Sequence, residues 1–180
     1  MKTLKVIFLV ISLLAVSNYN HAQEIHKSSE KGKSTLGVGV GFPYGAIGAR
    51  FGVNVIDHLT IFGGVGYQLS GVGYNFGLLK DFKSKTATQF YLTGMYGTNA
   101  AIKIDGLSEY DKVYTGATFG LGIKINSKRK EGNFWDVGLL LPIRSSSYKN
   151  DERQVENDPR ISEFTKAWPI GITIGYNFGL

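Results

Sequence analysis

The chain of 180 residues has no cysteine, 3 histidines and only 4 prolines. The absence of cysteine excludes a disulfide scaffold, a cysteine-ligated zinc and a cysteine nucleophile. The histidines stand at positions 21, 26 and 58, and the first two precede the predicted domain. Because a metal centre usually needs several clustered ligands, we expect neither a metal site nor any other cofactor.

Long hydrophobic runs are also missing, apart from one near the start. Lys2 and Lys5 precede an apolar run from Val6 to Val16, and a short polar stretch then leads to Ala22. This layout predicts a secretory signal peptide over residues 1–22. A membrane-spanning helix needs roughly 20 apolar residues, so a short membrane anchor is the weaker alternative.

Charge of either sign is modest, with 20 basic against 14 acidic residues. Cleavage after Ala22 would remove two lysines and leave 18 basic residues. Such an excess does not indicate nucleic-acid binding, which export would also contradict. Residues 23–33 are polar and are predicted to be a flexible lead-in to a domain at residues 34–180. Any membrane role of that domain must use strands or a peripheral surface.

Glycine and aromatic residues are abundant, with 24 Gly, 11 Phe and 10 Tyr. Beyond residue 33 the chain divides into eight segments of roughly ten residues in which apolar and small or polar residues alternate. These segments are Ser34–Phe42, Gly45–Ile56, Leu59–Leu69, Val72–Phe82, Thr88–Thr98, Val113–Ile125, Phe134–Arg144 and Ala167–Phe178. The pattern predicts an all-β fold, an eight-stranded antiparallel up-and-down barrel with little helix.

The two faces of these strands differ in chemistry. One face is apolar and uncharged, as in Leu36, Val38 and Val40, whereas the other is rich in Gly, Asn, Gln and Thr. A soluble barrel would turn its apolar face inward and would seldom expose so much glycine. A transmembrane barrel has the inverse arrangement, and a lipid-facing charge there costs about 2–4 kcal/mol. We therefore predict a transmembrane barrel, with a soluble secreted barrel that binds an apolar ligand as the alternative.

Aromatic residues gather toward both ends of the strands, as in the interfacial girdles of membrane barrels. The residues predicted to form these girdles are Phe42, Tyr67, Tyr74, Tyr96 and Trp168 at one rim, and Trp135, Tyr176 and Phe178 at the other.

A few charged residues fall on the inward face and are the main mechanistic lead. These predicted lumen charges are Arg50, Lys124, Asp136 and Arg144. If Ile125 pairs with Trp135, Lys124 lies opposite Asp136, and we expect an ion pair between them because enclosed charges need partners. The set would either form a plug that satisfies itself or line a narrow or gated pore.

The positions of Arg50 and His58 indicate what each side chain does. Arg50 lies in mid-strand, where Asp81 or Asp136 could answer its charge. His58 follows Asp57 in a predicted two-residue turn, which favours a role in turn chemistry over catalysis.

An even number of strands puts both chain ends on one side, the periplasm. The two longest links, residues 99–112 and 145–166, then face outward as this architecture expects. Functional residues on a scaffold often lie in such loops, although a solvated loop without a partner is the simpler reading.

The last strand, Ile172–Leu180, carries alternating Tyr176 and Phe178. Together with the strand count, it resembles the small outer-membrane β-barrels of Gram-negative bacteria, the OmpA/OmpX-like class. That resemblance implies location in the outer membrane, contact with its lipid, and recognition by the barrel-insertion machinery. It also implies a monomeric, non-enzymatic scaffold whose outer loops bind an extracellular ligand or an envelope protein.

Overall fold

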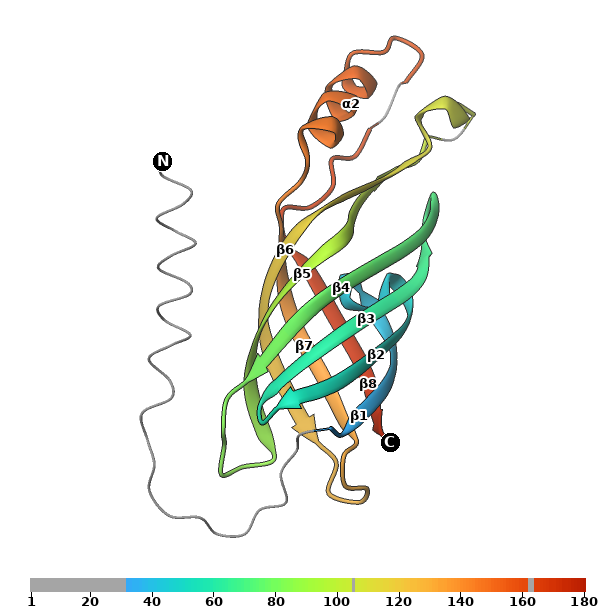
Figure 1. Ribbon diagram of the computed structural model, residues 1–180. Helices are drawn as coiled ribbons and strands as arrows, with labels where there is room; N and C mark the ends of the chain where they lie inside the picture. The colour runs from blue at the N-terminus through green and yellow to red at the C-terminus, as the bar shows by residue number, and fades with distance from the viewer. Residues whose placement is uncertain (1–31, 105, 162–163) are drawn as a thin grey trace, which may run out of the picture.

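The computed structural model describes residues 32–104, 106–161 and 164–180 (Figure 1). The predicted signal peptide and most of the lead-in lie outside the described residues. The strands are β1 (Ser34–Gly41), β2 (Ala46–Ile56), β3 (Leu59–Gln68), β4 (Gly71–Asp81), β5 (Thr88–Ile102), β6 (Lys112–Asn126), β7 (Phe134–Pro142) and β8 (Gly171–Gly179). They form a closed antiparallel barrel in chain order, which confirms the predicted fold class.

The barrel closes where the last strand meets the first. β1 pairs with β8 from Thr35 opposite Gly179 to Val40 opposite Ile174. The backbone N–H of Leu180 donates to the carbonyl of Ser34 at 2.9 Å, so both ends of the barrel lie at one rim (Figure 1). We call this the inner rim and the opposite one the outer rim.

Strand alternation sets which side chains face outward and which face the lumen. Phe76 is 67% exposed on the outside, whereas its neighbour Asn75 is fully buried inside the barrel. Within the eight strands the only charged residue of outward parity is Lys80, one residue before β4 ends. Ile125 pairs with Trp135, so Lys124 lies opposite Asp136 in the ladder.

Several strand ends differ from the prediction. β5 and β6 continue above the outer rim as a long hairpin, with a bulge between Thr98 and Ala100 (Figure 1). β8 begins only at Gly171, so Trp168 precedes the strand rather than opening it. Pro169 has no N–H to donate to a ladder, which explains the late start.

The links contain short helices that the strand pattern did not indicate. Two are 3₁₀ turns, η1 (Phe42–Tyr44) and η2 (Ser108–Tyr110), and one is an α-helix, α2 (Ser146–Glu156). α2 begins after Ser145, whose hydroxyl accepts a hydrogen bond from the N–H of Tyr148 at 3.3 Å, a typical N-cap. Among the described residues, no helix is long and apolar enough to cross a membrane.

Candidate functional site

The link between β1 and β2 folds into the barrel. Pro43 and Tyr44 of η1 are buried, and Tyr44 is 0% exposed, although they form the short link between the first two predicted strands. Gly41 and Gly45 have positive φ values of 117° and 67°, which let the chain turn in and out again. The 3₁₀ turn also interrupts the alternation of inward and outward side chains along the strand. Phe42 therefore packs on the lumen core instead of joining the predicted outer girdle.

Glycines on the inward face make room for this turn, which we call the lumen plug (Phe42–Tyr44). A Cβ at Gly64 would lie 2.0 Å from the carbonyl oxygen of Pro43, and one at Gly66 would lie 2.4 Å from that of Tyr44. A Cβ at Gly175 would lie 2.1 Å from the Tyr44 hydroxyl. These distances are too short for any side chain, so the inward glycines accommodate backbone as well as large side chains.

A buried polar network holds the lumen plug. Oδ2 of Asp136 accepts hydrogen bonds from the Tyr44 hydroxyl at 2.7 Å and from Nδ2 of Asn177 at 3.0 Å. The same oxygen forms an ion pair with Arg50, whose guanidinium carbon lies 4.7 Å from the centre of the Tyr44 ring. Three donors around Oδ2 offset much of the cost of burying this charge, whereas Oδ1 has no hydrogen-bond partner among the described residues.

A second ion pair lies nearer the inner rim. Nζ of Lys124 lies 2.9 Å from one oxygen of Asp81, and Nδ1 of His58 lies 3.0 Å from the other. The predicted pair between Lys124 and Asp136 is therefore wrong, although the two residues face each other in the ladder. Arg50 reaches Asp136 from across the lumen, which leaves Lys124 to pair with Asp81 on β4.

Below the plug, a cavity of about 560 Å³ reaches the inner rim. Arg50, Asp81 and Lys124 line it together with hydroxyl and amide side chains such as Thr60 and Gln89. Phe62, Leu79 and Phe134 line it as well, so the cavity combines charged, hydrogen-bonding and apolar surface.

Arg144, predicted to be a lumen charge, lies outside the barrel because β7 ends at Pro142. Its guanidinium donates to the carbonyls of Ala167, at 3.1 Å, and Trp168. It also lies 5.2 Å from the centre of the Tyr148 ring. Arg144 therefore braces the two ends of the β7–β8 link instead of lining the lumen.

Above the outer rim, α2 and the β5–β6 hairpin form a small folded unit, which we call the outer lobe (the described residues of 99–117 and 144–168). Its buried apolar side chains are Ala100, Ile102, Tyr114, Tyr148 and Val155. The Tyr114 and Tyr148 rings meet edge to face at 5.3 Å. The strand pattern indicated only two long outward-facing links here, whereas this apolar cluster holds α2 against the hairpin.

Polar contacts reinforce the outer lobe. Oδ2 of Asp151 accepts a hydrogen bond from the Tyr114 hydroxyl at 2.7 Å and pairs with Nζ of Lys112 at 3.1 Å. The hydrogen bond from Tyr114 and, to a smaller extent, that from Lys112 lower the pKa of the Asp151 carboxyl below its usual range.

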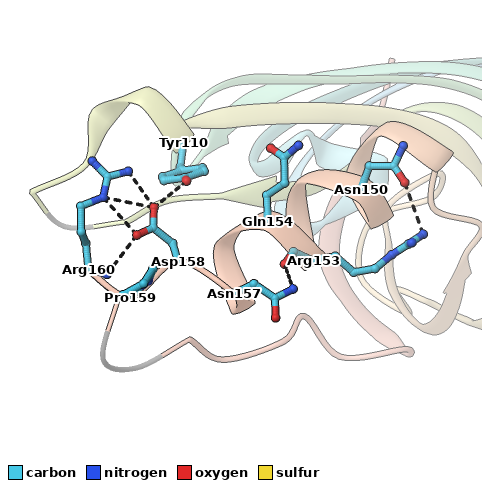
Figure 2. Close-up of a pocket in the computed structure, with 8 residues that line it drawn as sticks. All are labelled: Tyr110, Asn150, Arg153, Gln154, Asn157, Asp158, Pro159 and Arg160. Carbon is cyan, nitrogen blue, oxygen red and sulfur yellow. Dashed lines mark hydrogen bonds and ion pairs between the residues drawn. The ribbon is translucent and has the colours of Figure 1, made fainter.

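A shallow groove of about 780 Å³ runs across the outer lobe (Figure 2). On one side, Asp158 accepts hydrogen bonds from the Tyr110 hydroxyl at 2.7 Å and from Arg160 at 2.6 Å. Arg160 also pairs with Glu109 at 2.6 Å, which ties the two outer links together. Hydrogen bonds from Arg160 hold the pKa of Asp158 well below its ordinary value.

The face of α2 forms the other side of the groove. Asn150, Arg153, Gln154 and Asn157 follow one another at helical spacing and carry hydrogen-bonding groups (Figure 2). The groove thus offers amide and guanidinium donors beside the fixed Asp158 carboxylate, and it suits recognition of a polar ligand more than chemistry on one.

The remaining girdle residues lie at the two rims. Tyr67, Tyr74, Tyr96 and Trp168 are exposed toward the outer rim. At the inner rim, Tyr176 packs edge to face against Trp135 at 5.0 Å and against Phe178 at 4.9 Å.

No protein-family model and no curated protein matches the chain. Among solved structures, the chain is similar to the N-terminal β-barrel domain of Pseudomonas aeruginosa OprF, with a TM-score of 0.48 and 16% sequence identity. The match covers 82% of this chain and 98% of that one. A similarity at this level concerns the fold and carries no information about ligands.

Two site elements escaped the sequence analysis, although the sequence carries a signal for each. Glycines flank Phe42-Pro43-Tyr44, and glycine is the residue that permits such a sharp inward turn. For α2, Ser145 is a good N-cap, and Tyr148 and Val155 stand seven residues apart on one helix face.

Proposed function

We propose that this protein is an integral outer-membrane barrel. The supporting observation is the uncharged apolar belt on the outward face of all eight strands, above Lys80 at the inner rim. Apolar residues this numerous and exposed would be unfavourable in water, whereas a bilayer covers them. Export through the predicted signal peptide would deliver the chain to that membrane.

Within this membrane, the protein acts as a monomeric, non-enzymatic scaffold that presents the outer lobe. Among the described residues, no three metal-ligating side chains cluster, and His58 is engaged with Asp81 in the turn region. The outer lobe is folded around its own core, so a partner would meet a preorganised surface and pay little ordering entropy. An extracellular ligand or an envelope protein that binds the groove is the expected partner.

Membrane insertion is tested by envelope fractionation and by electrophoresis with and without boiling. We expect recovery in the outer membrane and a heat-shifted band. Because the chain has no cysteine, topology can be read with Lys149→Cys in α2 and Lys128→Cys in the β6–β7 link. A membrane-impermeant maleimide should label only the first in intact cells. Recovery as a soluble periplasmic protein would refute the proposal.

We infer from the lumen plug that the barrel does not conduct. Tyr44 and its partners Arg50 and Asp136 occupy the lumen above the cavity. We expect no discrete channels from the reconstituted protein in a planar bilayer. Discrete conductance steps that appear only when the protein is present would support the narrow or gated pore instead.

A further inference from the structure

The inner rim has a surplus of positive charge. The β4–β5 link (residues 82–87) and the β6–β7 link (residues 127–133) together carry five exposed basic side chains: Lys83, Lys85, Lys128, Arg129 and Lys130. We call these five residues the basic sector. None of them forms an ion pair with any residue that the structure describes. Glu131, the one carboxylate in the two links, lies 3.9 Å from Lys33 instead.

The two links belong to one part of the rim. β5 and β6 are neighbours, and Thr88 at the start of β5 pairs with Ile125 near the end of β6. The N–H of Asn126 donates to the carbonyl of Ala87 at 2.8 Å. Both links project beyond the barrel at the end that carries the C-terminus (Figure 1). The basic sector is therefore one patch.

The depth of this patch follows from its neighbours. Phe82 directly precedes Lys83, and Phe82, Phe90 and Trp135 are exposed on the outward face at the same rim. Aromatic residues of this kind mark the boundary between hydrocarbon and head groups. The basic side chains, which begin one residue beyond that boundary, reach head-group level.

The outer lobe provides a contrast within the same molecule. Lys112, Arg160 and Lys166 pair with acidic residues of the lobe. Over residues 99–117 and 144–168 the sequence has seven basic and eight acidic residues, so the surplus of positive charge is a property of the inner rim and is not shared by the opposite end.

We propose that the basic sector binds the phosphodiester head groups of anionic phospholipids in the leaflet next to the inner rim. This inference rests on the proposed membrane insertion. Lysine and arginine at a membrane surface each attract anionic lipid with about 1 kcal/mol. The patch lies beside the aromatic girdle, so lipid head groups at this depth meet its side chains directly. An acidic protein would need a matching surface that extends into the bilayer interface.

The two tryptophans allow a direct test with the full-length chain reconstituted in vesicles of phosphatidylcholine and a minority of phosphatidylglycerol. Trp168→Phe leaves Trp135 as the reporter at the inner rim, and Trp135→Phe leaves Trp168 as the reporter beyond the outer rim. Bromine on the acyl chains of either lipid quenches tryptophan fluorescence on contact. We expect Trp135 to be quenched more strongly by brominated phosphatidylglycerol than by the same fraction of brominated phosphatidylcholine, and Trp168 to show no such preference.

Replacing all five residues of the basic sector by serine should lower the preference at Trp135 about fivefold or more, the ratio equivalent to about 1 kcal/mol. The matched control Lys103→Ser/Lys149→Ser removes two exposed charges from the outer lobe and should leave the preference unchanged. Equal quenching by both lipids in an inserted, heat-shifted barrel would overturn the inference while leaving the proposed function intact.

The other outcomes are equally decisive. No quenching by either lipid would overturn membrane insertion and the lipid site together. If soluble polyglutamate bound the micelle-held protein through the basic sector while lipid preference was absent, the patch would be a docking site for an acidic protein, contrary to the inference. If soluble glycerol phosphate, added at constant ionic strength, abolished the quenching preference at Trp135, the ligand of the basic sector would be a free phosphate instead of a lipid head group.

Discussion

Replacing Arg50 by methionine should measure how strongly the lumen network depends on its ion pair. The substitution leaves Asp136, which is 0% exposed, without a cation. Removal of one partner from a buried pair typically costs about 3–5 kcal/mol. Asp136 keeps the donors Tyr44 and Asn177, so we expect the lower end, about 3 kcal/mol of unfolding free energy.

The reciprocal change should cost less. Asp136→Asn keeps an oxygen acceptor for Tyr44, and Arg50 borders the polar cavity, so we expect a loss of about 1–2 kcal/mol. The double variant leaves neither charge unpaired, and its loss should be no greater than that of Arg50→Met alone. The assay is equilibrium unfolding in urea, followed by tryptophan fluorescence, with the micelle-held barrel checked by its heat-shifted band. Losses that simply add in the double variant would refute the reasoning, because additivity means that the two side chains do not interact.

Three further outcomes follow from the packing and the outer contacts. Gly64→Ala should prevent formation of the heat-shifted band, because its Cβ would lie 2.0 Å from the Pro43 carbonyl oxygen. The control Gly94→Ala, whose Cβ would have its nearest contacts at 3.6 Å, should leave the heat-shifted band intact. Val155→Ala should cost about 1–2 kcal/mol of local stability and speed amide exchange in α2 without affecting the barrel; unchanged exchange would contradict the packing of α2. The lowered pKa of Asp158 means that its contact with Arg160 contributes fully above the ordinary value of 3.8 and is lost only as pH falls through the lower folded value. The amide exchange rates of residues 106–111, corrected for the intrinsic pH dependence of exchange, should therefore be constant from pH 7 to pH 5. A rise within that window would contradict the lowered pKa of Asp158.

The strand pattern predicted the barrel because a period of two residues fixes both the strands and the faces of their side chains. The structure has the register of Ile125 with Trp135 that the sequence analysis took as a condition. The ion pairs followed only in part, since long side chains cross the lumen to partners on strands that are not adjacent. Asp136 on β7 is one of the two partners expected for Arg50 on β2, whereas Lys124 pairs with Asp81 instead of Asp136.

The lumen plug and α2 escaped prediction for different reasons. Phe42-Pro43-Tyr44 contains the residues of an ordinary turn, and only the glycines on other strands, such as Gly64 and Gly175, show that the turn has space inside. α2 is short and mostly polar, so its apolar stripe consists of Tyr148 and Val155 alone. Its helical state depends on the β5–β6 hairpin, which the sequence places far away.

The lumen network has a consequence for the order in which the barrel assembles. The network joins both ends of the chain, because Tyr44 lies in the β1–β2 link, Arg50 on β2, Asp136 on β7 and Asn177 on β8. The sequence separations of its contacts range from 41 to 133 positions. Contacts between such distant parts of a chain form late, because the loop-closure entropy must be paid first. Until β8 pairs with β1, Asp136 lacks the partners that Tyr44, Arg50 and Asn177 provide together. Closure of the ring and burial of the charges thus become a single cooperative step, so an unfinished barrel retains a hydrated lumen and a complete one resists reopening.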